Sequence, residues 1–242
     1  MRHFATVLAV VAVTAATLGL GLPAPAVNAA GGATVTIPGD MYTPAVVVIE
    51  VGQAVTWVNK DSDKHTAVAA PGAPEAFSVP AFPGNSVSRT FTKAGVYSYL
   101  CDEHATFDRA LHRATARRSS DMFPIAMEGL IIVKGPGLTG ASEDSIAISN
   151  GNIAPDFTVI KTGGKVTWKN DDKDRVLEFP GSGVDKIALP AGKSGSATFA
   201  KPGVYLFYDS NSATFDQKLG LAKAKSGTKT FPVSMQGFVI VL

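Results

Sequence analysis

The feature of this sequence that most restricts its fold is an internal repeat. Residues 44–68 align without a gap on residues 155–179, and residues 93–133 align on residues 201–241. The groups Gly-Val-Tyr, Ala-Thr-Phe-Asp, Phe-Pro and Met-x-Gly recur at matching places in both copies. A chain of 242 residues would suit one large sandwich or two small domains. The repeat favours two copies of one domain.

The boundaries of the two copies follow from the alignment and from local composition. We expect the first domain over residues 33–134 and the second over residues 144–242. Between them, residues 135–143 are rich in Gly and include Pro136. Such a composition is typical of a short linker.

Each copy has the pattern of antiparallel β-structure. Short runs rich in β-branched and aromatic residues alternate with clusters of Gly, Pro, Asn and Asp. In the first copy these runs cover residues 46–51, 54–58, 86–91, 96–99 and 130–133. Several short strands at this spacing favour a sandwich or a small barrel. The predicted fold class is therefore all-β, with two tandem sandwiches.

One segment of each copy departs from the strand pattern. Apolar residues between His104 and Phe123 recur at helical spacing, and the second copy has a similar pair. These residues are Phe107, Ala110, Leu111 and Ala114 in the first copy, and Phe215 and Leu219 in the second. The spacing predicts a short helix before the last strand of each domain. Its Arg and Lys residues form either a solvated face or a docking patch for an acidic partner.

The N-terminus has the pattern of an export signal. Arg2 and His3 precede an uncharged stretch over residues 4–22, and small residues lead up to Ala29. This pattern predicts a signal peptide over residues 1–29 that is cleaved after Ala29. The apolar stretch is long for a signal, so an uncleaved membrane anchor is the alternative.

The rest of the chain favours a location outside the cytoplasmic membrane. No cysteine stands directly after the predicted cleavage point, which argues against a lipoprotein anchor. Beyond residue 30 no apolar run is long enough to span a bilayer, so we expect no membrane span after signal cleavage. We expect an exported, extracytoplasmic protein that is periplasmic, bound at the cell surface or secreted.

The charge balance excludes some classes of partner. Without Arg2 the chain has 21 Lys and Arg against 20 Asp and Glu. A nearly neutral protein is not expected to bind nucleic acid or an anionic membrane surface.

The chemistry of the chain is concentrated in the first copy. Cys101 is the only cysteine, so it cannot form an internal disulfide, and it stands three residues before His104. His65 lies in a loop after a predicted strand, and Met127 stands at the start of the last one. A thiolate, two imidazoles and a weak thioether suit a mononuclear copper that carries one electron. We predict His65, Cys101, His104 and Met127 as metal ligands.

These motifs together resemble those of the plastocyanin and pseudoazurin branch of the cupredoxins. The motifs are Val-Gly-Gln-Ala-Val-Thr-Trp-Val-Asn over residues 51–59, Gly-Val-Tyr-Ser-Tyr-Leu-Cys-x-x-His over residues 95–104, and Met-x-Gly-x-Ile-x-Val over residues 127–133. The resemblance covers nearly all of residues 34–134 and, more faintly, residues 144–242.

The resemblance implies a Greek-key β-sandwich that holds one type 1 (blue) copper per chain. It implies His65, Cys101 and His104 as equatorial ligands and Met127 as the axial ligand. It also implies that His104 lies nearest the surface and offers the edge through which electrons pass to a redox partner protein.

The segment between His104 and Met127 departs from the family pattern. Relatives have only a few residues there, whereas this chain has 22. Met122 and His112 lie inside this insertion. The axial ligand is therefore Met127, Met122, His112 or none of them.

The second copy lacks most of the ligand set. The gap-free alignment places Val176 opposite His65, Asp209 opposite Cys101 and Ser212 opposite His104. Met235 alone persists, opposite Met127. We expect the second domain to be a degenerate cupredoxin domain without copper.

The ligand set distinguishes among the possible functions. The leading hypothesis is an extracytoplasmic one-electron carrier, and the main alternative is a copper carrier or buffer with no electron-transfer role. A third reading, two adhesion domains with an incidental cysteine, leaves the ligand pattern unexplained. We do not expect an enzyme, because His112 is the one histidine left to build a further copper centre unless several chains share a site.

Overall fold

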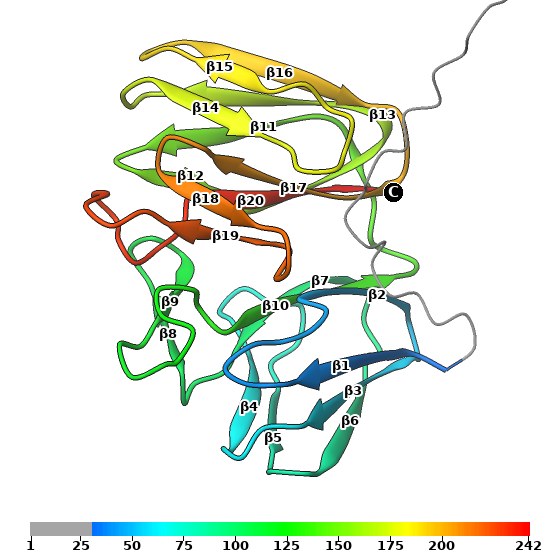
Figure 1. The fold of residues 1–242 in the computed structure, drawn as a ribbon. Coiled ribbons are helices and arrows are strands. Elements are labelled where there is room, and N and C mark those ends of the chain that lie inside the picture. The colour runs from blue at the N-terminus through cyan, green and yellow to red at the C-terminus, as the bar shows by residue number, and fades with distance from the viewer. Residues whose placement is uncertain (1–30) are drawn as a thin grey trace, which may run out of the picture.

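The computed structural model describes residues 31–242, so the predicted signal peptide over residues 1–29 lies outside the described part. Within residues 31–242 every regular element is a strand, and none is a helix long and apolar enough to cross a membrane. Figure 1 shows two stacked bodies of sheet, with the N-terminal half below and the C-terminal half above. The predicted all-β sandwich class is confirmed.

The N-terminal half is a sandwich of two sheets. One sheet has the strand order β1-β3-β6 and the other has the order β2-β10-β7-β4-β5. Between them lie large aromatic and aliphatic side chains, including Trp57, Tyr97, Tyr99 and Phe91, none of which is more than 1% exposed. The strands of this half are β1 (Ala33–Ile37), β2 (Val46–Glu50), β3 (Ala54–Asn59), β4 (His65–Ala69), β5 (Ser78–Ala81), β6 (Ser86–Thr90), β7 (Gly95–Leu100) and β10 (Glu128–Lys134).

The C-terminal half repeats this arrangement, with one long strand, β13, in place of the two strands β2 and β3. The first part of β13 pairs with β20, and its second part pairs with β11 and β16, so all eight strands join into one sheet. Trp168, Phe199 and Phe207 fill its core. The strands of this half are β11 (Ala141–Ser149), β12 (Asn152–Ala154), β13 (Phe157–Asn170), β14 (Arg175–Glu178), β15 (Ile187–Leu189), β16 (Ser194–Phe199), β17 (Gly203–Asp209) and β20 (Gln236–Val241).

The predicted helical insertions are wrong, because each is a two-stranded hairpin. In the first half β8 (Ala105–Asp108) pairs with β9 (Arg113–Ala116), and in the second half β18 (Ala213–Asp216) pairs with β19 (Leu221–Ala224).

The aspartate that ends the first strand of each hairpin explains the error. Asp108 Oδ1 accepts hydrogen bonds from the backbone N–H groups of Ala110 at 2.9 Å and Leu111 at 3.0 Å. Asp216 makes the same bonds to Lys218 and Leu219. A side chain that binds the backbone in this way favours a turn over a helix.

The two halves pack through an apolar interface. Leu130 and Ile132 of β10 point away from the first core and contact Ile240 of β20 and its neighbours. This explains why β10 is apolar on both faces, because each face is covered.

The hairpins lie at the same end of the molecule in Figure 1, and Arg113 of β9 donates to the carbonyl of Gln236. The interface therefore joins the two sandwiches and their hairpins into one packed body.

Candidate metal centre

Cys101 and His104 are brought together by a tight turn at the end of β7. The N–H of Cys101 donates to the carbonyl of Met127 at 3.0 Å, which continues the pairing of β7 with the chain entering β10. The carbonyl of Cys101 then accepts from the N–H groups of His104 at 3.2 Å and Ala105 at 2.8 Å. The three-residue spacing therefore returns the His104 ring to the cysteine sulfur.

His65 reaches the same sulfur from the first residue of β4. Its neighbour Thr66 donates its backbone N–H to Cys101 Sγ at 3.3 Å, which fixes the start of β4 beside the end of β7. Both His65 and Cys101 are fully buried, whereas the His104 side chain is 14% exposed.

The three side chains form a compact set of donor atoms. The Nδ1 atom of His65 lies 3.8 Å from Cys101 Sγ, and the Nδ1 atom of His104 lies 3.5 Å from it. Two atoms that bind one tetrahedral ion at metal distances of 2.0–2.3 Å lie about 3.5 Å apart. The separations therefore suit a single ion bound by one thiolate and two imidazoles.

The electrostatics favour the thiolate form of Cys101. Burial raises its pKa, but hydrogen bonds from His65, Thr66 and His104 outweigh burial and lower the pKa to about 6. The thiolate is the form of cysteine that binds a metal. Cys101 is thus prepared for a metal at neutral pH.

Two aspartates that the sequence analysis missed contact the outer edges of both imidazoles. Asp61 Oδ2 lies 2.9 Å from His65 Nε2, and Asp40 Oδ1 lies 3.3 Å from His104 Nε2. The hydrogen bond with His65 lowers the pKa of Asp61, and Asp61 helps to raise the pKa of His65 against the effect of burial. A carboxylate on the outer nitrogen leaves Nδ1 free to face the sulfur.

The three candidate axial residues lie in different places. Met127 is buried in the first core together with Cys101, and its carbonyl binds the cysteine N–H. Met122 instead packs in the interface cluster with side chains of the second half, and His112 is exposed and packs edge-on against Phe107. Of the three, Met127 is the one next to Cys101.

The position of Met127 depends on the glycine of its Met-x-Gly group. Gly129 pairs with Tyr99 of β7, and a Cβ at Gly129 would lie only 2.4 Å from the Tyr99 ring. The absence of a side chain therefore lets β10 lie close against β7, which holds Met127 beside Cys101.

The corresponding place in the second half holds a buried ion pair. Asp209 donates its N–H to the carbonyl of Met235 at 2.9 Å, as Cys101 does to Met127. Val176 donates its N–H to Asp209 Oδ1 at 3.1 Å, as Thr66 does to Cys101 Sγ. These matching bonds correct the gap-free alignment.

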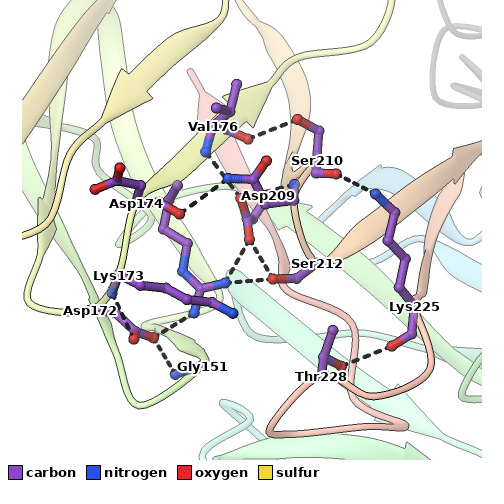
Figure 2. A network of polar contacts seen from close by, with 12 residues as sticks. Gly151, Asp172, Lys173, Asp174, Val176, Asp209, Ser210, Ser212, Lys225 and Thr228 are labelled. Carbon is purple, nitrogen blue, oxygen red and sulfur yellow. Dashed lines mark hydrogen bonds and ion pairs between the residues drawn. The ribbon is translucent and has the colours of Figure 1, made fainter.

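The residue at the place of His65 is therefore Arg175. Its Nη1 atom lies 2.8 Å from Asp209 Oδ2 and also donates to Ser212 Oγ, while Nη2 lies 2.6 Å from Asp172 Oδ2 (Figure 2). Arg175, Asp209 and Ser212 are all buried. A side-chain cation thus contacts the residues at the places of Cys101 and His104.

A β-sandwich with a buried cysteine and two imidazoles at one end has the features of a small metal-binding domain, and comparison with known proteins supports this class. Residues 34–109 match the family described as copper binding proteins, plastocyanin/azurin family. The match supports a cupredoxin fold for this part of the chain.

The similar solved structures include several of amicyanin. An oxidized amicyanin mutant is 24% identical, with a TM-score of 0.32 over 43% of this chain and 82% of that chain. A Cu(I) amicyanin mutant is 25% identical, with the same TM-score over 43% of this chain and 83% of that chain. The copper-binding family supports copper as the metal for which His65, Cys101 and His104 form a ligand group.

Proposed function

We propose that this protein is an extracytoplasmic one-electron carrier with one type 1 copper held by His65, Cys101, His104 and, axially, Met127. The observation that carries the proposal is the approach of two imidazole Nδ1 atoms to one buried sulfur of low pKa, at 3.8 and 3.5 Å. When bound, copper would supply a Cu(II)/Cu(I) couple, for which this set of soft and borderline donors is suited.

The chain's own residues would keep the site rigid and dry. Hydrogen bonds of the backbone fix Cys101 to Met127 and Thr66 to the cysteine sulfur, so the chain itself holds the donors in place. Full burial of His65 and Cys101 excludes water from them. A buried site that the chain holds in this way favours electron transfer over a carrier or buffer role, since copper exchange would require the ligands to open.

His104 is the proposed contact with a redox partner protein, because it is the most exposed of the three donors. Export rests on the N-terminal sequence, whose charged start and apolar stretch are typical of a signal peptide. We propose no bond-making reaction for this chain.

We further propose that the chain consists of two domains of one type, over residues 33–134 and 144–242, with residues 135–143 between them. The second would be copper-free, because Arg175 fills the place of a metal with a guanidinium that Asp172 and Asp209 neutralise.

The test is the optical spectrum of the copper-loaded full-length protein. We expect an intense visible band from thiolate-to-copper charge transfer, which Cys101→Ser abolishes together with the redox wave. His112→Ala is the matched control, since it removes a histidine outside the cluster and should leave the band unchanged. A colourless Cu(II) form of the unaltered protein would contradict the proposal.

A further inference from the structure

The outer nitrogen of each imidazole in the candidate metal centre faces a carboxylate, and the acid beside His104 has the more unusual setting. Asp40 is buried, and its Oδ1 lies 3.3 Å from His104 Nε2. It stands in the loop between β1 and β2, far from His104 in the sequence. The fold therefore delivers a buried negative charge to the imidazole that is the more exposed of the two.

The insertion between His104 and Met127 holds Asp40 in place. After the β8–β9 hairpin, Arg117 donates its N–H to the carbonyl of His104 at 2.8 Å. The same segment continues to Asp121, whose N–H donates to Asp40 Oδ2 at 2.7 Å. The insertion thus holds one oxygen of Asp40 by a hydrogen bond, and the other oxygen faces the imidazole.

The second half provides an internal comparison for the two acids. Asp172 stands at the place of Asp61, where it binds Arg175 instead of an imidazole. Gly151 stands at the place of Asp40, because the strand pairs Thr36–Thr43 and Ala147–Ala154 bracket the same loop. An acid at the place of Asp61 is present in both halves, beside an imidazole in one and a guanidinium in the other. The acid at the place of Asp40 is found in the half that has the imidazoles.

We propose that Asp40 is a positioning residue that orients His104 and lowers the reduction potential of the copper site; this inference rests on the proposed function. With Nδ1 turned to the sulfur, the proton of the neutral ring is on Nε2, which faces the Asp40 carboxylate at 3.3 Å. This contact favours one orientation of the ring and makes the imidazole a stronger donor. A fixed negative charge in a buried site also stabilises the more highly charged oxidation state.

The first test is the reduction potential of the copper-loaded full-length Asp40→Asn protein. Asparagine keeps an oxygen for the N–H of Asp121 and removes the charge. We expect the preference for Cu(II) over Cu(I) to fall about tenfold, which raises the potential by about 59 mV, while the visible band persists. Asp172→Asn is the matched control, because it removes an acid from the other half, and it should leave the potential unchanged.

The second test needs no copper. Nitrogen NMR of the metal-free protein should show His104 with its proton on Nε2, and Asp40→Asn should give a mixture of the two tautomers. If Asp40→Asn fails to fold, Asp40→Ser supplies the same two measurements with a smaller uncharged side chain.

The possible results separate the two proposals. An unchanged potential and an unchanged tautomer in a blue Asp40→Asn protein would overturn the role of Asp40. A colourless unaltered protein would overturn the electron-carrier function, and the NMR measurement would still decide whether Asp40 orients His104.

Discussion

Arg175 and Asp209 form a buried ion pair, 2.8 Å from Nη1 to Oδ2, at the place that corresponds to His65 and Cys101 in the first half. Neither side chain is more than 3% exposed. The main backbone bonds around the two places correspond, so similar scaffolds hold a candidate metal-ligand set in one half and an internal cation in the other. Side chains thus connect β4 to the end of β7 in the first half and β14 to β17 in the second, with different chemistry in each.

The first prediction concerns the stability that this ion pair provides. Arg175→Met should lower the free energy of unfolding by about 3–5 kcal/mol, because it leaves the carboxylate of Asp209 buried without its cation. Lys165→Met is the matched control, since Lys165 pairs with Glu143 on the surface at 3.0 Å and such pairs contribute about 0–1 kcal/mol. Urea unfolding of the metal-free proteins measures both, and equal losses would contradict the prediction.

The second prediction is that the second half can be converted into a copper site. The combined substitutions Arg175→His, Asp209→Cys and Ser212→His place the three donors at the positions defined by the matching backbone bonds, and Met235 already stands at the place of Met127. We expect the bound copper to rise from one to two ions per chain, as measured by metal analysis and by the visible band.

Adding Cys101→Ser to the triple variant isolates the new site. That protein should keep one copper and a charge-transfer band. A stoichiometry that stays at one in the triple variant, with a folded second half, would show that the scaffold alone does not define the site.

Much of the fold could be predicted from local sequence, and the hairpins show where this fails. Runs of β-branched and aromatic residues predicted β2, β3, β6, β7 and β10 to within two residues at each end. In the first hairpin, Phe107 and Ala114 fit helical spacing, but they face each other as partners on β8 and β9. The carboxylate of Asp108 favours a turn here by accepting hydrogen bonds from the backbone. The spacing of apolar residues contains no information about these bonds.

The site was predictable where its geometry is local. Cys101 and His104 are joined by a single turn, so their spacing alone indicated a pair of donors. Asp40 comes from another loop, and no sequence pattern links it to His104. Arg175 was missed because the loop after Asn170 is one residue shorter than the loop after Asn59, which a gap-free alignment cannot show.

The third prediction concerns the contact between the first hairpin and the second half. Arg113 is buried and donates through Nη1 to the carbonyls of Gln236 at 2.9 Å and Ser234 at 3.4 Å. Arg113→Met should lower the free energy of unfolding by about 2–3 kcal/mol, since it removes charged hydrogen bonds to the buried carbonyl of Gln236. Arg109→Met, at an exposed site on the same hairpin, should change it by less than about 0.5 kcal/mol. A thermal unfolding series that ranks the two variants equally would contradict this role.

The fourth prediction concerns the pH dependence of stability at the same interface. Burial, assisted by the charge of Asp156, raises the pKa of Glu128 from 4.5 to about 7, against the opposing charge of Arg113. Because the folded-state pKa is the higher one, this group stabilises the fold fully below about pH 4.5, and its contribution is lost as the pH rises to about 7.

Glu128→Gln imitates the protonated form and keeps a partner for Gln236. Relative to the unaltered metal-free protein, its stability in urea should therefore increase between about pH 4.5 and 7 and stay constant above that range. Glu143→Gln, on the exposed surface, should follow the unaltered protein through the same window, and a Glu128→Gln curve that also does so would show that Glu128 is not protonated in the folded state.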